Sequence, residues 1–170
     1  MATVTLKGDK IHTSGDLPKK GEKAPDFKLT TTDLQTKSLK DYEGQNLILN
    51  IFPSIDTKVC ALSVRQFNRQ ATKLDDTKVL CVSRDLPFAM KRFIGNDNVE
   101  DVVSLSDYKD GNFGKAYGVE FVDGPFETLL SRCVVVIDKE RKVVYTEQVS
   151  EIDDEPNYDA AINSLSLSFQ

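Results

Sequence analysis

Three short apolar runs separated by helical stretches constrain the fold of this chain more than any other feature. Leu47–Phe52 is almost wholly apolar, which is typical of a strand that is covered on both faces of a sheet. Lys78–Ser83 and Val102–Ser106 are read as two further strands of the same sheet. The helices expected between these strands cover residues 59–74 and 87–93.

The rest of the chain extends this sheet. Cys133–Asp138 and Lys142–Glu147 are predicted to form an antiparallel hairpin, and Asn157–Leu167 the closing helix. The order of the elements predicts an α/β fold with a mixed central sheet and helices on its faces. Asp85 is expected to cap the short helix that begins near Pro87.

The N-terminal segment, over about residues 1–17, is predicted to form a β-hairpin of its own. Val4–Thr13 alternates between polar and apolar residues around Gly8-Asp9, which is a turn signal. The chain has 170 residues, enough for one domain with a real core, and it contains neither an internal repeat nor a second boundary. Residues 1–170 are therefore expected to form a single domain.

Composition excludes several classes of function. The chain carries 27 acidic and 22 basic residues, a net charge of −5, which argues against a nucleic-acid partner. No stretch approaches the roughly 18 apolar residues of a membrane span, and the N-terminus has no secretory signal pattern. Three cysteines without a close pair indicate a reducing compartment, so we expect a cytoplasmic location.

The single histidine limits the chemistry further. His12 lies in the predicted N-terminal hairpin and would have to serve any cysteine–histidine pair or zinc site. No ligand spacing surrounds it, so we expect no metal and no cofactor. A reactive cysteine in this chain must be activated by a helix terminus and by an arginine.

The segment Pro53–Cys60 has the pattern of such a site. Cys60 falls in the first turn of the helix predicted after Leu47–Phe52, where unpaired N–H groups and the helix dipole favour a negative charge on sulfur. Thr57 can donate a hydrogen bond to the sulfur or to a substrate oxygen. Pro53 can shield the thiolate and stiffen the loop through its fixed φ. The residues therefore favour a nucleophilic thiolate at Cys60.

Arg132 is the candidate for the missing positive charge. It opens the strongly apolar strand that begins at Cys133, has no evident partner in sequence, and would stabilise the thiolate and polarise a peroxide O–O bond. Taken one by one, these residues also have structural interpretations. A cysteine near a helix start is often a buried core residue, and an isolated arginine often forms a surface ion pair. It is the spacing of Pro53, Thr57 and Cys60 that favours chemistry.

The chain resembles the peroxiredoxins, in particular the bacterial thiol peroxidases of the atypical two-cysteine type. Pro53-Ser-Ile-Asp-Thr-Lys-Val-Cys60 is similar to their active-site motif, and the likeness covers almost the whole chain. Further matching segments are the N-terminal hairpin, Gly21–Phe27, Cys81–Phe88, Ala116–Gly118, Asp123–Pro125, Arg132–Asp138 and Glu151–Tyr158.

This resemblance implies a thioredoxin-like fold with an N-terminal β-hairpin, and a homodimer. It implies reduction of hydrogen peroxide and organic hydroperoxides with electrons from thioredoxin or a small thiol. By the same resemblance Cys60 is the peroxidatic cysteine, which becomes a sulfenic acid, while Thr57, Arg132 and Pro53 are its hydroxyl, cationic and shielding partners.

The chain departs from that pattern at Ile94. The family has there a second cysteine, which resolves the sulfenic acid as a disulfide, and isoleucine cannot do so. The favoured interpretation is a one-cysteine cycle with an external thiol reductant. Cys81 or Cys133 could substitute instead, although Cys133 should face away from Arg132 because neighbours along a strand point to opposite faces. Ile94 could also be an engineered change.

Other functions remain open at this point. A peroxide sensor would oxidise at Cys60 and relay the oxidation to a partner protein. A thioredoxin-type oxidoreductase lacks its Cys-x-x-Cys pair. An apolar pocket for lipid-like hydroperoxides is a further possibility, and its candidate residues are Phe88, Phe93, Ile94, Phe121 and Phe126.

Overall fold

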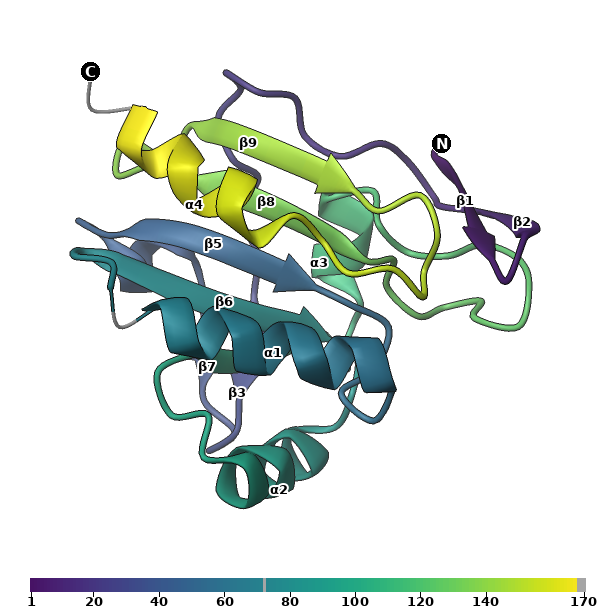
Figure 1. Ribbon diagram of the computed structural model, residues 1–170, viewed down its shortest axis with the longest axis horizontal. Helices are drawn as coiled ribbons and strands as arrows, with labels where there is room; N and C mark the ends of the chain where they lie inside the picture. Colours follow the sequence, from purple (N-terminus) through teal and green to yellow (C-terminus); the bar gives the residue numbers. More distant parts are fainter. Residues whose placement is uncertain (72, 168–170) are drawn as a thin grey trace.

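A seven-stranded mixed sheet forms the centre of the computed structural model, which describes residues 1–71 and 73–167 (Figure 1). The strand order is β4-β3-β7-β6-β5-β8-β9. Its three parallel strands are β5 (Asn46–Ile51), β6 (Thr77–Ser83) and β7 (Val103–Ser106), the three apolar runs of the sequence. All six residues of β5 are buried, so the prediction of a strand covered on both faces is confirmed.

Antiparallel strands complete both edges of the sheet. β3 (Leu29–Thr31) and β4 (Thr36–Lys37) lie at the β7 edge, and a short 3-10 helix, η1 (Leu39–Tyr42), follows them. β8 (Cys133–Ile137) and β9 (Val143–Gln148) form the predicted hairpin at the other edge, where β8 pairs with β5. The mixed sheet expected from the order of elements is therefore present.

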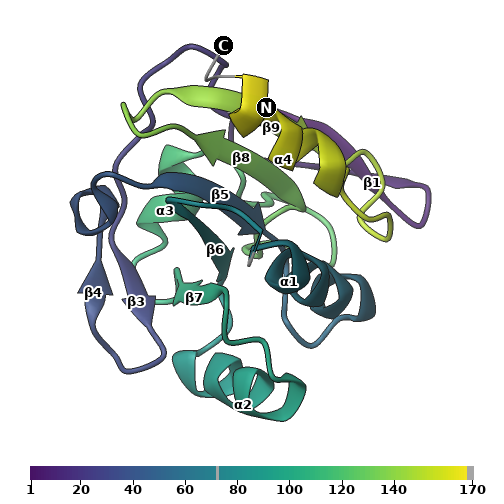
Figure 2. The same cartoon turned by 60° about the vertical axis from the view of Figure 1, so that its left-hand side comes forward.

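Helices cover both faces of the sheet (Figure 2). α1 (Lys58–Ala71) and α4 (Tyr158–Leu167) lie on one face, and the short α3 (Asn112–Ala116) lies on the other. α2 (Pro87–Asp97) stands beyond β7, on the same side as α1. α1 ends at Ala71, before the end expected at about residue 74, and Thr72 lies outside the described residues.

The side chains of each central strand alternate between two cores. The α1-side core contains Cys60 and Cys81 and is completed by Ile48, Phe52, Ile55, Val64, Phe67, Val79, Val99, Val102, Val134, Val136, Ala161 and Leu165. The α3-side core, on the opposite face, contains Cys133 between the strands and α3. Successive residues of a strand point to opposite faces, so Cys133 and Val134 enter different cores.

The N-terminal hairpin is a separate two-stranded sheet. Its strands are β1 (Thr3–Leu6) and β2 (Asp9–His12), and its two-residue turn is Lys7-Gly8, with φ of 51° and 89°. The turn was predicted at Gly8-Asp9, one residue too late. Two consecutive positive φ values fit a type I′ turn, and in this turn the glycine is the second residue and not the first. The hairpin packs its own core of Val4, Ile11, Phe121 and Ile152.

α2 begins and ends differently from expectation. Its N-cap residue is Leu86, which makes no side-chain capping bond, and the helix runs on to Asp97. The prediction that Asp85 caps this helix is wrong, because its carboxylate is engaged by the loop that follows β5. Among the described helices, none has both the length and the apolar character needed to cross a membrane.

Candidate active site

The junction between β5 and α1 positions Cys60. The N–H of Phe52 donates to the carbonyl of Val82 at 3.1 Å, and after it the chain leaves the sheet through the buried Pro53. The N–H of Thr57 closes a turn onto the carbonyl of Ser54 at 3.2 Å, and α1 begins one residue later. Cys60 is the third residue of α1, so it lies in the turn whose N–H groups have no partner within the helix.

The side chain of Cys60 is enclosed. It has no exposed area and belongs to the α1-side core. The free N–H groups of the first helical turn and the positive end of the helix dipole therefore act on it in a medium with little water. Reactive cysteines of proteins are often found at such helix N-termini.

Thr57 lies directly before α1 with its side chain half-buried. Its Oγ1 donates to the carbonyl oxygen of Ser54 at 3.1 Å. Within the described part of the chain, no hydrogen bond joins the sulfur of Cys60 to Thr57 or to Arg132. The carbonyl of Ser54 thus holds the hydroxyl of Thr57 in the loop, and Thr57 precedes Cys60 by three residues.

Arg132 reaches the same end of the sheet from the distant strand β8. It precedes Cys133, which pairs with Ile51, so Arg132 lies beside the point where the chain leaves β5. Arg132 alternates in step with Val134, which enters the α1-side core, so its side chain lies on the face of the sheet that carries Cys60.

The guanidinium of Arg132 is buried and only partly satisfied. The residue is 2% exposed, and its Nε donates to the carbonyl of Ile152 at 2.6 Å. Among the described atoms its Nη1 has no hydrogen-bond partner. A buried donor without a partner is costly in a folded protein, and such groups are often reserved for a ligand. Nη1 is therefore available to an oxygen atom that enters the site.

Asp85 is a residue of this region whose contacts sequence reasoning missed. Its carboxylate accepts hydrogen bonds from Ser54 Oγ at 2.7 Å, from the N–H of Ile55 at 2.7 Å and from Ser83 Oγ at 2.6 Å. These contacts join the end of β6 to the loop after β5, two segments about 30 residues apart. A local sequence signal for a contact at that separation does not exist, although parallel neighbouring strands bring their carboxyl ends to one edge.

The other two cysteines are buried in environments that disfavour ionisation of their thiols. Burial raises the pKa of Cys81 to about 12, against a hydrogen bond from Asn50 that lowers it. Burial likewise raises the pKa of Cys133 to about 12, and this thiol lies in the core on the far face of the sheet from Cys60. Thiols with such pKa values remain protonated near neutral pH and are poor nucleophiles.

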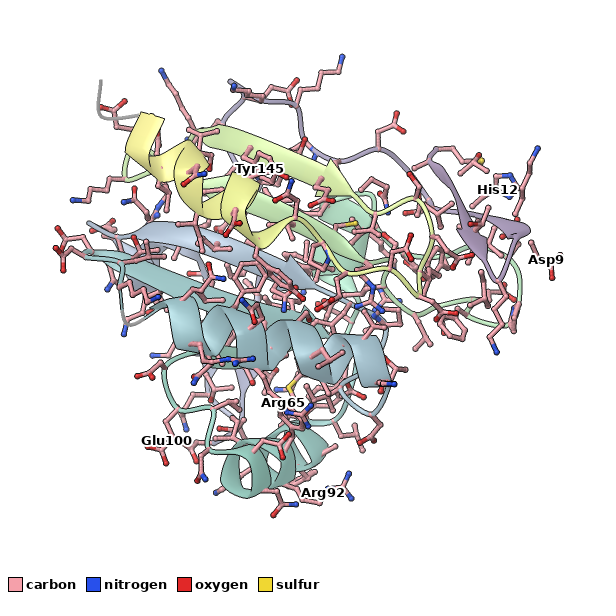
Figure 3. The ribbon with its side chains drawn as sticks, in the orientation of Figure 1. Asp9, His12, Arg65, Arg92, Glu100 and Tyr145 are labelled. Carbon is pink, nitrogen blue, oxygen red and sulfur yellow. The ribbon has the colours of Figure 1, made fainter. Side chains whose placement is uncertain are left out.

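A groove of about 580 Å³ runs beside the site, between α1 and α2, and Thr57 is among its lining residues. Two ion pairs cross it: Arg65 contacts Asp97 at 2.6 Å, and Arg92 contacts Asp56 at 3.3 Å. Figure 3 shows Arg65 between the two helices and Arg92 on α2. The groove is therefore polar and bridged by charges.

The apolar pocket considered from the sequence is not formed. Phe93 and Ile94 both pack half-buried against the α1-side core, and Phe93 also lines the groove. Phe88 is 66% exposed, while Phe121 and Phe126 pack under the N-terminal hairpin. Phe88, Phe93 and Ile94 all belong to α2 but differ in burial, and the other two lie in the separate hairpin core. The five side chains therefore do not line one cavity. Among the described residues, no group of three or more histidine, cysteine, aspartate or glutamate side chains could hold a metal ion.

Comparisons with known proteins show the family to which this chain belongs. Residues 19–162 match the Redoxin family. The thiol peroxidase of Mycobacterium tuberculosis (strain ATCC 25618 / H37Rv) is 50% identical over 165 residues, which cover 97% of this chain and 99% of that protein. The thiol peroxidase of Corynebacterium glutamicum is 46% identical, with the same coverage.

A solved structure gives the same result. The crystal structure of a peroxiredoxin-like protein from Aquifex aeolicus has a TM-score of 0.92 and 36% identity, and covers 98% of this chain and 97% of that one. The predicted thioredoxin-like fold of a peroxiredoxin is therefore confirmed. The chain belongs to the Redoxin family, as a thiol-dependent peroxidase of the thiol peroxidase branch of the peroxiredoxins.

Proposed function

We propose that Cys60 is the peroxidatic nucleophile of this thiol-dependent peroxidase, and that Thr57, Arg132 and Pro53 complete its site. The observation that carries the proposal is the buried, unpartnered Nη1 of Arg132 on the face of the sheet where Cys60 lies at a helix start. A guanidinium stays protonated and donates in fixed directions, so it can hold a peroxide oxygen against the sulfur.

The first half-reaction uses these residues as follows. The Cys60 thiolate attacks the terminal oxygen of the hydroperoxide, an S–O bond forms and the O–O bond breaks. The leaving oxygen takes up a proton and departs as water or an alcohol, and the sulfur becomes a sulfenic acid. Arg132 and the N–H groups of the first turn of α1 stabilise the negative charge that develops on oxygen, while Pro53 excludes water.

The second half-reaction, in this proposal, uses an external thiol. One thiol displaces water from the sulfenic acid to give a mixed disulfide, and a second thiol releases Cys60 with formation of the reductant's disulfide. Support comes from the unreactive Cys81 and Cys133, and from Ile94 at the place of the resolving cysteine in the family. Two electrons from two thiols thus balance the reduction of one peroxide.

The reductant in this proposal is thioredoxin or a small thiol, and the enzyme works in the cytoplasm as a homodimer. A reducing compartment supplies such thiols and keeps three buried cysteines free, as they are in this structure. Leu86 and Phe88, 54% and 66% exposed around the first turn of α2, support a surface that a second copy covers. Size-exclusion chromatography with light scattering measures the assembly.

A peroxidase assay of the wild type against Cys60→Ser tests the nucleophile. Activity is expected to disappear in the variant with thioredoxin and with small thiols alike, and undiminished activity would defeat the assignment. Trapping with dimedone after one equivalent of peroxide tests the one-cysteine cycle. We expect a long-lived adduct on Cys60, whereas an immediate Cys60–Cys81 or Cys60–Cys133 disulfide on non-reducing mass spectrometry would rule this cycle out.

A further inference from the structure

We propose that Asp85 is a positioning residue for the reaction of Cys60 with peroxide. The proposal rests on the nucleophilic role of Cys60 and concerns how the loop between β5 and α1 keeps its shape. Its basis is a continuous set of contacts from β6, through the carboxylate of Asp85, to Thr57.

Asp85 is itself held firmly. Its backbone N–H donates to Ser83 Oγ at 3.3 Å, and its carbonyl accepts a hydrogen bond from Ser106 Oγ. Ser83 and Ser106 close two adjacent strands of the central sheet, β6 and β7. The carboxylate therefore projects from the paired ends of two sheet strands, and regular elements of this kind give precise support to a functional site.

Both carboxylate oxygens of Asp85 accept hydrogen bonds from the loop between β5 and α1. Oδ1 accepts from Ser54 Oγ at 2.7 Å, and Oδ2 accepts from the N–H of Ile55 at 2.7 Å and from Ser83 Oγ at 2.6 Å. Hydrogen bonds to an ionised acceptor are short and about twice as strong as those between neutral groups. Two consecutive residues that follow Pro53 are thus fixed to β6.

Ser54 connects Asp85 to Thr57, whose hydroxyl belongs to the proposed site. Its Oγ accepts from the N–H of Asp56 at 3.2 Å, and its carbonyl accepts from both the N–H and the Oγ1 of Thr57, at 3.2 and 3.1 Å. Thr57 is the residue before α1, and its carbonyl accepts from the N–H of Ala61 at 3.0 Å to close the first helical turn. Asp85 thereby fixes Thr57 and the helix start that carries Cys60.

A purely structural carboxylate would affect folding stability alone. A positioning residue also changes the reactivity of the properly folded protein, because a displacement of about 1 Å in a reacting group can cost about 100-fold in rate. The loop leads directly into the first turn of α1, so its loosening should also displace the N–H groups of that turn. Rate and pH dependence of Cys60 reactivity therefore distinguish the two roles.

The test compares Asp85→Asn and Ser54→Ala with a matched control, Asp138→Asn. Asp138 is a half-exposed aspartate whose Oδ1 accepts from the N–H groups of Glu140 and Lys142 at 2.9 Å, in the β8–β9 turn at the opposite end of β8 from Arg132. Three quantities are measured on full-length reduced protein: the rate of Cys60 oxidation by hydrogen peroxide in a single turnover, the pH midpoint of Cys60 alkylation by iodoacetamide, and the Tm.

For Asp85→Asn we expect oxidation to slow about 10- to 100-fold, with the pH midpoint of alkylation displaced from that of the wild type, in samples that circular dichroism shows to be folded. Ser54→Ala, which removes one contact, should give a smaller loss in the same direction. Asp138→Asn should lower the Tm without changing either reactivity. Oxidation rates within twofold of wild type in Asp85→Asn, or in Ser54→Ala if the first variant does not fold, would overturn the proposal. A Cys60→Ser arm that keeps peroxidase activity would instead overturn the nucleophile assignment.

Discussion

Arg132 Nε donates a hydrogen bond of 2.6 Å to the backbone carbonyl of Ile152, and this contact ties the buried guanidinium to the N-terminal hairpin. The N–H of Ile152 donates to the carbonyl of Thr5 at 2.9 Å, and the N–H of Thr5 donates to the carbonyl of Ser150 at 2.8 Å. β1 therefore holds the segment on which Arg132 rests. The hairpin, at the side of the molecule in Figure 1, is part of the support of the site.

Arg132→Lys should remove most of the peroxide reactivity of Cys60. Lysine cannot keep one donor on Ile152 and aim a second in a fixed direction, so the rate of sulfenic acid formation should fall about 100-fold or more. Arg141→Lys is the matched control, because Arg141 also donates to backbone carbonyls, those of Gln45 and Leu39, away from the site. An equal fall in both variants would mean that loss of an anchored arginine, not its position, lowers the rate.

Thr57→Val should lower the rate of Cys60 oxidation by about 100-fold, since the two side chains have the same shape and only the hydroxyl is lost. Thr57→Ser keeps the hydroxyl and should stay within a few-fold of wild type. Single-turnover oxidation by hydrogen peroxide measures both variants. A Thr57→Val rate equal to or above that of Thr57→Ser would contradict a role for Oγ1, because losing the hydroxyl would then cost no more than losing the methyl group.

Ile94→Cys should convert the protein to a disulfide cycle. Ile94 packs against the core that contains Cys60, so a thiol at this place on α2 should capture the sulfenic acid once the local structure opens. Non-reducing mass spectrometry after one equivalent of peroxide should find a disulfide between Cys60 and the introduced thiol, with a much weaker dimedone adduct. Lys91→Cys places a thiol on the exposed side of α2 and should leave the adduct unchanged.

Acidification should weaken the hydrogen bonds that join Glu151 to the N-terminal hairpin. The N–H of Asp153 is the largest of several hydrogen bonds that lower the pKa of Glu151 below its ordinary value of 4.5, and Gly8 and Thr5 add to it. A carboxylate with a lowered folded-state pKa stabilises the fold above its unfolded-state pKa, and this contribution is lost as the pH falls through the folded-state pKa.

Glu151→Gln should therefore have a lower Tm than wild type at pH 7, and the difference should persist down to a pH of about 4.5 and then vanish on further acidification. Thermal unfolding followed by circular dichroism between pH 7 and pH 3 measures it. Glu140→Gln, at an exposed position of the β8–β9 turn, is the matched control for loss of a surface carboxylate. A constant difference at every pH would exclude ionisation of Glu151 as its cause.

Local pattern predicted the elements well. The apolar run at Leu47–Phe52, the helix that carries Cys60 and the β8–β9 hairpin all lie within a few residues of their expected bounds. Hydrophobic periodicity and turn residues report on interactions within a few residues, and these elements depend on such interactions. The predicted position of the hairpin turn was wrong by one residue. Lys7 adopts a positive φ beside Gly8, although non-glycine residues rarely do so.

Asp85 marks the limit of local pattern. A serine or aspartate shortly before a proline fits a helix N-cap equally well whether or not a loop from another strand competes for its oxygens. Here the N–H of Ile55 and the hydroxyl of Ser54 take the carboxylate, and α2 begins without a side-chain cap. The candidate apolar pocket failed for a similar reason, since Phe93 packs against the α1-side core, Phe121 lies in the hairpin core and Phe88 is exposed.

Residue types and their short spacing are enough to predict the chemical groups of the candidate site: a cysteine in the first turn of a helix, with a threonine and a proline before it, and isoleucine at position 94. Which distant groups meet them depends on the folded chain. The register of the sheet places Arg132 beside the end of β5. The carbonyl of Ile152 accepts a hydrogen bond from its Nε, while its Nη1 has no partner among the described atoms. Asp85, which follows β6, accepts a hydrogen bond from the loop after β5. These contacts join segments dozens of residues apart, and their geometry is set by strand pairing and packing, which no local pattern encodes.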